Sequence, residues 1–144
     1  MSHIDVEFEY RAIQKYPHMR TRDQEIWARF IEKNPNRFFR VWYDWHVGEH
    51  QCFGETCDNC ESVGWYDLTR CKIDVVAEDD NAIYIIEIKP NAGAGAVGQA
   101  LEYAQFFRED EKPRLPVIGV VLTDTINKNT ARFAAANKVE MWTA

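Results

Sequence analysis

A short apolar run, Ile83-Tyr84-Ile85-Ile86-Glu87-Ile88, most constrains the fold, because it is nearly continuous and rich in β-branched residues. Such a run is typical of a strand that is buried on both faces. Glu87 and Lys89 break the pattern at its end. Residues two apart in a strand point to the same face, so we expect both charges on one side. Charged groups at the end of a central strand are costly unless they are paired or bind something, which favours a functional role.

The segment before this run, residues 70–77, predicts a second strand, and the acidic stretch 78–81 predicts the turn between the two. A loop of two residues at 79–80, or of four at 78–81, sets Asp74 opposite Ile85. Asp74 is then the diagonal neighbour of Glu87 on the same face, about 7 Å away between backbones. Both carboxylates could hold one ion at that distance. A three-residue loop would place them on opposite faces, so the prediction requires an even loop.

The spacing of these residues resembles that of a known family. Asp74, followed after twelve residues by Glu87-x-Lys89, is similar to the signature of the PD-(D/E)XK nuclease superfamily, with Ile73 in place of the usual proline. Gln99-x-x-x-Tyr103 resembles a motif of its RecB-type branch. The likeness extends over roughly residues 20 to 144, judged by the order of elements. It implies an α/β fold of the restriction-endonuclease-like type, with a mixed central sheet flanked by helices.

The resemblance also implies an activity, the metal-dependent hydrolysis of phosphodiester bonds, in DNA rather than RNA. Asp74, Glu87 and the Ile88 carbonyl would hold one or two Mg²⁺ or Mn²⁺ ions, which activate a water and neutralise charge on the phosphate. Lys89 would stabilise that charge or help deprotonate the attacking water. A nuclease-fold module that binds nucleic acid or protein without cleavage is the alternative from another functional class.

Three further side chains complete the expected site. Gln99 and Tyr103 are four residues apart and therefore adjacent on one helix face. Gln99 would order a water or the lysine, and Tyr103 would contact nucleic acid, whereas the same pair taken alone is more often ordinary helix surface. Glu25 matches the acidic residue that the first helix contributes in the resembled family. A solvated glutamate in the first turn, favoured by the helix dipole, is the equally simple alternative for Glu25.

A glycine motif offers a competing interpretation. Gly93-x-Gly95-x-x-Gly98 follows a predicted strand and opens a helix, as in a dinucleotide-binding fold. Only twenty residues follow Asp124, too few for the remaining strands of a doubly wound sheet, and this interpretation gives Glu87 and Lys89 no role. The glycines would more simply allow a close approach of helix and sheet, or let backbone amides meet a phosphate.

A cysteine-rich loop, residues 46–64, is expected as an insertion between two strands. Two residues between Cys57 and Cys60 let both thiolates reach one tetrahedral zinc ion. Cys52 is the natural third ligand, and His50 or Cys71 the fourth. Free thiols and a single disulfide stay open as alternatives to structural zinc, although disulfides are disfavoured inside cells.

Composition and charge limit the class of protein. A chain of 144 residues suits one domain over its whole length. Hydrophobic residues make up 46% and aromatic residues 13%, which excludes disorder. No run approaches the roughly 18 apolar residues of a membrane span, and residues 1–5 do not form a signal peptide, so we expect a cytoplasmic protein without a membrane partner. The resemblance adds a viral or mobile-element context, with an infected host cell as one location, and leaves a homodimer open.

The net charge of −6 counts against a broad phosphate-binding surface, although basic side chains can still cluster locally. Periodicity and capping signals predict the remaining elements, with a capping box at Thr21 and Gln24 opening the first helix and Leu101 in the apolar stripe of the second. We expect helices over residues 22–33, 94–108 and 128–137, and strands over 37–47, 117–122 and 139–142.

Overall fold

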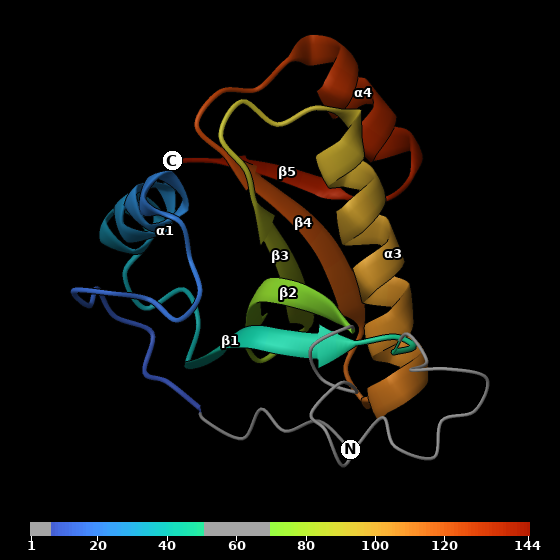
Figure 1. The fold of residues 1–144 in the computed structure, drawn as a ribbon, viewed down its shortest axis with the longest axis horizontal. Helices are drawn as coiled ribbons and strands as arrows, with labels where there is room; N and C mark the ends of the chain where they lie inside the picture. The colour runs from blue at the N-terminus through green and yellow to red at the C-terminus, as the bar shows by residue number, and fades with distance from the viewer. Residues whose placement is uncertain (1–6, 51–69) are drawn as a thin grey trace.

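A mixed five-stranded sheet forms the centre of the fold in the computed structural model, which describes residues 7–50 and 70–144 (Figure 1). The strands lie side by side in the order of the sequence. β1 to β3 are antiparallel neighbours, whereas β3 to β5 run parallel. The strands are β1 (Arg40–Val47), β2 (Cys71–Glu78), β3 (Ile83–Ile88), β4 (Val117–Thr123) and β5 (Glu140–Thr143).

Helices cover both faces of this sheet. α1 (Thr21–Lys33) packs on one face, and α3 (Ala94–Glu111) and α4 (Lys128–Ala136) pack on the other (Figure 1). The central run predicted as a strand is β3, with five of its six residues buried. The expected helices and strands are confirmed within a few residues at each end. Among the residues described, no helix is long and apolar enough to cross a bilayer.

The α1 face of the sheet is packed with aromatic side chains. Trp27 is fully buried, stacks on Phe30 with ring centroids 5.6 Å apart, and donates its indole N–H to the Tyr43 hydroxyl at 2.9 Å. Phe30 in turn stacks on Trp142 of β5 at 5.3 Å. The aromatic-rich segment predicted as a strand therefore supplies core, with its regular part beginning at Arg40 rather than at residue 37.

The turn between β2 and β3 has four residues, so the even loop is confirmed, but the predicted register is wrong by two residues. Glu78 pairs with Ile83, and Ile85 lies opposite Val76 rather than Asp74. The reason is local. Asp79 Oδ1 accepts hydrogen bonds from the backbone N–H groups of Asn81 and Ala82, at 2.8 and 2.9 Å, which draws Ala82 into the turn.

Continuing the observed β2–β3 register by one pair beyond Val75 and Ile86 sets Asp74 directly opposite Glu87. The backbone N–H of Ile88 donates to Asp74 Oδ2 at 2.9 Å, which fixes the Asp74 side chain against the end of β3. The two acids therefore meet across neighbouring strands, nearer to each other than the diagonal placement would put them.

The entry into α1 differs from the capping box predicted at Thr21 and Gln24. Arg20 is the N-cap residue and makes no side-chain capping bond. The Gln24 side chain instead accepts from the Tyr16 backbone N–H at 3.2 Å and donates to the Met19 carbonyl at 2.8 Å. Gln24 thus ties the preceding loop to the first turn of the helix.

The glycines at the start of α3 do not bring helix and sheet together. A Cβ atom at Gly93, Gly95 or Gly98 would meet nothing within 4 Å, so that prediction is wrong. The close approach is at Gly119 of β4, where a Cβ atom would lie 2.9 Å from the Ala100 carbonyl oxygen of α3. Leu101, predicted as part of the apolar stripe of this helix, is 39% exposed.

The sheet topology also contradicts the dinucleotide-binding interpretation. A doubly wound fold needs parallel strands on both sides of the one that precedes the glycine motif. That strand is β3, and its neighbour β2 is antiparallel to it.

Candidate active site

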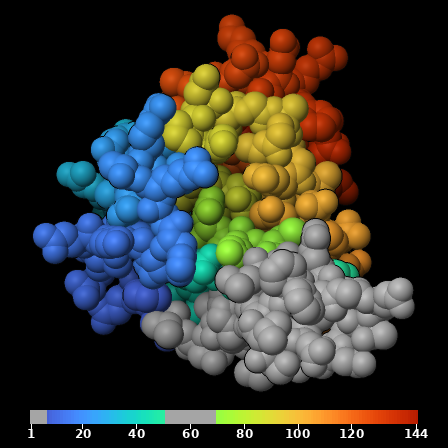
Figure 2. All heavy atoms as spheres, viewed as in Figure 1, coloured from blue at the N-terminus to red at the C-terminus, as the bar shows by residue number. Residues whose placement is uncertain are grey.

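A cavity of about 530 Å³ opens at the start of β2 and the end of β3, between the N-terminal turn of α1 and the first half of α3. Figure 2 shows this face of the molecule hollowed between the blue atoms of α1 and the yellow and orange atoms of α3, with green atoms of the β2 and β3 region inside the hollow. Its lining is unusually rich in charge. The charged residues around it are Arg20, Arg22, Asp23, Lys72, Asp74, Glu87 and Lys89.

Asp74 and Glu87 form the acidic floor of this cavity. Burial is the largest influence on Asp74 and raises the pKa of its carboxyl group to about 6, against the opposing hydrogen bond from the Ile88 amide. Burial also raises the pKa of Glu87 well above its usual range, and the neighbouring charge of Asp74 adds to the rise. A hydrogen bond between the two carboxyl groups lowers the pKa of Asp74 and raises that of Glu87.

One oxygen of this pair has no hydrogen-bond partner among the residues that the structure describes. Glu87 is only 6% exposed, and its Oε1 atom is buried without a hydrogen bond to any described residue. A buried carboxylate oxygen without a donor is unfavourable, and a cation is the natural group to satisfy it. Two carboxylates suit Mg²⁺ or Mn²⁺, which are bound through one or two carboxylates and keep several waters. In the described part of the chain, no group of three or more His, Cys, Asp or Glu side chains is placed to hold a metal.

Lys89 follows β3 directly and extends an exposed side chain along the cavity. Its backbone N–H donates to the Leu122 carbonyl of β4 at 3.0 Å, so the main chain at this position is part of the sheet ladder. Glu87 and Lys89 both line the cavity, as the two-residue spacing in a strand predicts. The predicted side chains of the acid-acid-lysine set are therefore neighbours around one space.

The acid that α1 contributes to the cavity is Asp23, whereas the sequence pointed to Glu25. Glu25 is exposed and does not line the cavity. Burial raises the pKa of the Asp23 carboxyl, and the nearby cations Arg20 and Lys89 oppose this rise. The signal was present in the sequence. Position 23 lies three and four residues before Ile26 and Trp27 and so shares their buried helix face, which position 25 does not.

Gln99 and Tyr103 of α3 lie together on the cavity wall, as their spacing predicts. Tyr103 is half-buried, and burial is the main cause of the raised pKa of its hydroxyl group. A side-chain hydrogen bond joins Tyr103 to Cys71, the first residue of β2. Gln99 is exposed and presents its amide group to the same space.

The predicted zinc ligands fall mostly outside the described residues, where Cys52, Cys57 and Cys60 lie. Of the remaining candidates, His50 is half-buried and Cys71 has a free thiol whose pKa is raised by burial. Zinc binding by this segment stays a prediction.

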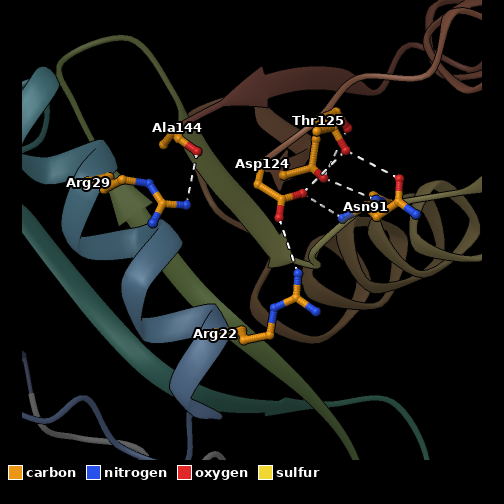
Figure 3. Close-up of polar contacts among 8 residues, drawn as sticks. Arg22, Arg29, Asn91, Asp124, Thr125 and Ala144 are labelled. Atoms are coloured by element: carbon orange, nitrogen blue, oxygen red, sulfur yellow. Dashed lines mark hydrogen bonds and ion pairs between the residues drawn. The ribbon is translucent and has the colours of Figure 1, made fainter.

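A polar cluster beside the cavity connects α1 to the ends of β3 and β4 (Figure 3). Asp124, which follows β4, accepts a hydrogen bond from the Asn91 N–H at 2.7 Å and lies 3.5 Å from the Arg22 guanidinium. The hydrogen bond from Asn91 is the largest cause of the lowered pKa of Asp124. Thr123 reinforces the same turn by accepting from the Ala92 N–H at 3.0 Å. The turn after Lys89 is thus held by residues that sequence inspection did not connect to the site.

Comparisons with solved structures identify the fold. One similar structure is that of EndoMS in a complex with dsDNA, with a TM-score of 0.50 and 17% identity over 92% of this chain and 48% of that chain. Another is a repair endonuclease from Pyrococcus abyssi, with a TM-score of 0.51 and 16% identity over 92% of this chain and 49% of that chain. This chain spans about half the length of each. No protein-family model and no curated protein matches the sequence.

At these identities the likeness establishes the fold, which is the predicted restriction-endonuclease-like arrangement of a mixed sheet flanked by helices.

Proposed function

We propose that this chain is a nuclease that hydrolyses phosphodiester bonds, with DNA as its substrate and Mg²⁺ or Mn²⁺ as its cofactor. The observation that carries the proposal is the placement of Asp74, Glu87 and Lys89 around one cavity, with a buried Glu87 oxygen that no described residue satisfies. The fold adds support, because two proteins that share it are described as a repair endonuclease and as a complex with dsDNA. Gln99 and Tyr103 on the same wall agree with the RecB-type branch.

Asp74 and Glu87, with the Ile88 carbonyl, would hold the ion. When bound, the ion supplies a Lewis acid beside the phosphate and lowers the pKa of a water molecule in the cavity. The hydrogen bond from the Ile88 N–H to Asp74 keeps that carboxylate oriented before any ligand arrives. Proton loss from the acid pair accompanies the ion's entry, because a metal ligand must be deprotonated.

Lys89 and Gln99 act on the substrate side of the cavity. The Lys89 ammonium group would stabilise the negative charge that develops on the phosphoryl oxygens, or help deprotonate the attacking water. Its position depends on the turn that Asp124 and Thr123 hold. The Gln99 amide can accept from and donate to a water molecule, and so orient it for attack.

The test is cleavage of labelled linear, circular and branched DNA by the full chain in Mn²⁺. We expect Asp74→Ala, Glu87→Ala and Lys89→Ala each to reduce the rate by about 10²- to 10⁴-fold. Glu32→Ala, an exposed acid elsewhere on α1, is the matched control and should cleave normally. Circular dichroism must show that every variant stays folded. Full activity in all three site variants contradicts the proposal, and DNA binding without any cleavage by the wild type points to a non-catalytic module.

A pair of variants separates the two acids of α1. Because Asp23 lines the cavity and Glu25 does not, we expect Asp23→Asn to slow cleavage and Glu25→Gln to leave it unchanged. The opposite result would place the contribution of α1 at Glu25, as in the resembled family.

A further inference from the structure

The mouth of the cavity is locally cationic on a protein that is acidic overall. Among the described residues that line it, four carry positive charge (Arg20, Arg22, Lys72 and Lys89) and three are acids (Asp23, Asp74 and Glu87). The protein as a whole has a net charge of −6. A polyanion approaching this surface is repelled over most of it and attracted where the positive groups collect. At the cavity mouth, a local excess of positive charge therefore lies next to the residues that we propose as catalytic.

Two of the cations at the mouth, Arg20 and Lys72, are free of ion pairs with described residues, unlike the two arginines at the other end of the β2–β3 hairpin. Arg37 is paired with Asp79, and Arg40 forms ion pairs with Glu7 at 3.2 Å and Glu78 at 2.6 Å. In contrast, Arg20 and Lys72 make no ion pair with any residue in 7–50 or 70–144. Basic side chains left without acidic partners beside an acidic floor are suited to bind an anionic ligand.

These cations also stand on opposite sides of the acid pair. Lys72 is on β2, two residues before Asp74, and so lies at the β2 side of the cavity. Arg20 and Arg22 come from the start of α1, and Arg22 reaches Asp124 at the end of β4. Because β3 lies between β2 and β4, the acid at the end of β3 is flanked on both sides. A chain of phosphates crossing the acid pair would meet positive charge before and after it.

Arg22 is held in place by a contact that a phosphate can replace. Its guanidinium lies 3.5 Å from Asp124 Oδ2, and its side chain is 71% exposed (Figure 3). An exposed ion pair of this kind contributes little to stability, so replacing Asp124 by a phosphate as the partner of Arg22 costs little free energy. Asp124 keeps its other role during such an exchange, because Oδ1 rather than Oδ2 accepts the hydrogen bond from the Asn91 N–H.

We propose that Arg20, Arg22 and Lys72 form a phosphate-binding rim, which holds the nucleic-acid backbone on both sides of the catalytic acids, with Asp124 positioning Arg22 before the ligand binds. The ligand chemistry is a run of backbone phosphodiesters read by charge, without recognition of base edges. This inference rests on the proposed function, because it takes nucleic acid as the ligand of the cavity.

The experiment measures binding separately from cleavage. The full chain is titrated with fluorescent duplex and single-stranded DNA in EDTA, at several salt concentrations from about 50 to 200 mM. Each phosphate contact that is lost lowers the slope of log affinity against log salt by about 0.9 for duplex and about 0.7 for single strands. We expect Lys72→Gln to lower the duplex slope by about 0.9 and the Arg20→Gln, Arg22→Gln double variant by about 1.8. Scrambling the DNA sequence should leave affinity unchanged.

Arg29→Gln is the matched control, because Arg29 is an exposed arginine of the same helix that bonds the Ala144 carbonyl away from the cavity (Figure 3). Its salt slope should equal that of the wild type. Unchanged slopes in all the rim variants, or a loss in Arg29→Gln as large as in Arg22→Gln, would overturn the rim. Strong dependence on base sequence would overturn recognition by phosphate alone.

Asp124→Asn isolates the positioning role, since an asparagine Oδ1 can still accept from the Asn91 N–H while the negative charge facing Arg22 is removed. We expect binding to tighten by about 1.5- to 5-fold. In an Arg22→Gln background the same change should have no effect, because the arginine it releases is absent. Tightening that persists in that background assigns the effect to general charge and overturns the positioning role.

The two proposals fail separately. If the wild type never cleaves DNA but the rim variants show the expected smaller salt dependence of binding, the nuclease assignment is wrong and the phosphate-binding rim is supported. If the wild type cleaves DNA in Mn²⁺ but the rim variants bind DNA as the wild type does, the nuclease assignment is supported and the phosphate-binding rim is wrong.

Discussion

Two buried polar groups in this molecule differ in whether another described residue satisfies their hydrogen bonds. In the aromatic core under α1, the Trp27 indole N–H is fully buried and finds its acceptor in the Tyr43 hydroxyl at 2.9 Å. At the start of β2 and the end of β3, Glu87 is almost as deeply buried, but it faces another carboxyl group, and one of its oxygens has no hydrogen-bond partner among the described residues. The first arrangement satisfies its polar atoms within the protein. The second leaves one oxygen to which our proposal assigns a metal ion.

This difference separates a region that supplies stability from the region of the proposed active site. A carboxyl pair with raised pKa values destabilises the folded protein at neutral pH, because burial disfavours both charged forms and the charge of Asp74 disfavours that of Glu87. The aromatic core offers the compensating stability, with stacked and edge-on rings that link α1, β1 and β5. Substitutions in the aromatic core and at the acid pair should therefore change stability in opposite directions.

The largest effect is expected in the aromatic core. Trp27→Ala removes a fully buried ring and leaves a cavity among its stacking partners, so we expect a loss of about 3–5 kcal/mol in the free energy of unfolding. Urea denaturation measures it. Phe39→Ala is the control, because Phe39 is 53% exposed and should change stability by no more than about 0.5 kcal/mol. Equal, small losses in both variants would show that the aromatic side does not supply this stability.

In metal-free protein, Asp74→Asn is expected to increase the free energy of unfolding, opposite to the effect of Trp27→Ala. The amide keeps an oxygen for the Ile88 N–H and removes a buried charge beside Glu87, so stability at pH 7.5 should rise by about 1–3 kcal/mol. The same variant should be inactive, which would make the acid pair a site where function is kept at a cost in stability. Thermal unfolding in EDTA gives the comparison, and a less stable variant contradicts it.

The pH dependence of this gain follows from the sign of the shift. Asp74 has a pKa of about 6 in the folded protein and 3.8 as its ordinary value, so the native state binds more protons between these limits. Wild-type stability therefore falls as pH rises from about 4 to 6, and the penalty stays constant above that range. The advantage of Asp74→Asn should be absent near pH 4, grow through this window and then level off. A gain that does not vary with pH would assign it to something other than this carboxyl.

Sequence reasoning succeeded where short-range patterns determine the structure and failed where tertiary contacts do. The apolar run of β3 and the periodic stripe of α3 placed both elements, and the even loop brought Asp74 and Glu87 to one face. The register was off by two because Asp79 draws Ala82 into the turn through its side chain, which residue counting alone does not reveal.

The rest of the site depends on distant partners. Arg22 and Asp124 lie far apart in the sequence, and neither pattern nor propensity connects them. Asp23 could have been identified, because the helical spacing from Ile26 and Trp27 places it on the inward face. The close packing of α3 on β4 was assigned to the conspicuous glycines of the helix, whereas the glycine that permits it is Gly119 in the strand.

The smallest expected effect is the stabilisation of the folded protein by a bound metal ion at the acid pair. If Asp74 and Glu87 bind a divalent cation, Mn²⁺ at about tenfold its dissociation constant should stabilise the wild-type protein by about 1.4 kcal/mol, since binding favours only the folded state. The melting temperature should then rise with Mn²⁺ in the wild type and stay constant in Asp74→Asn and Glu87→Gln. Glu32→Gln, which changes an exposed acid, controls for loss of charge alone. An equal rise in all four proteins would place the ion elsewhere, and the unpartnered Glu87 oxygen would then lack the role that its burial suggests.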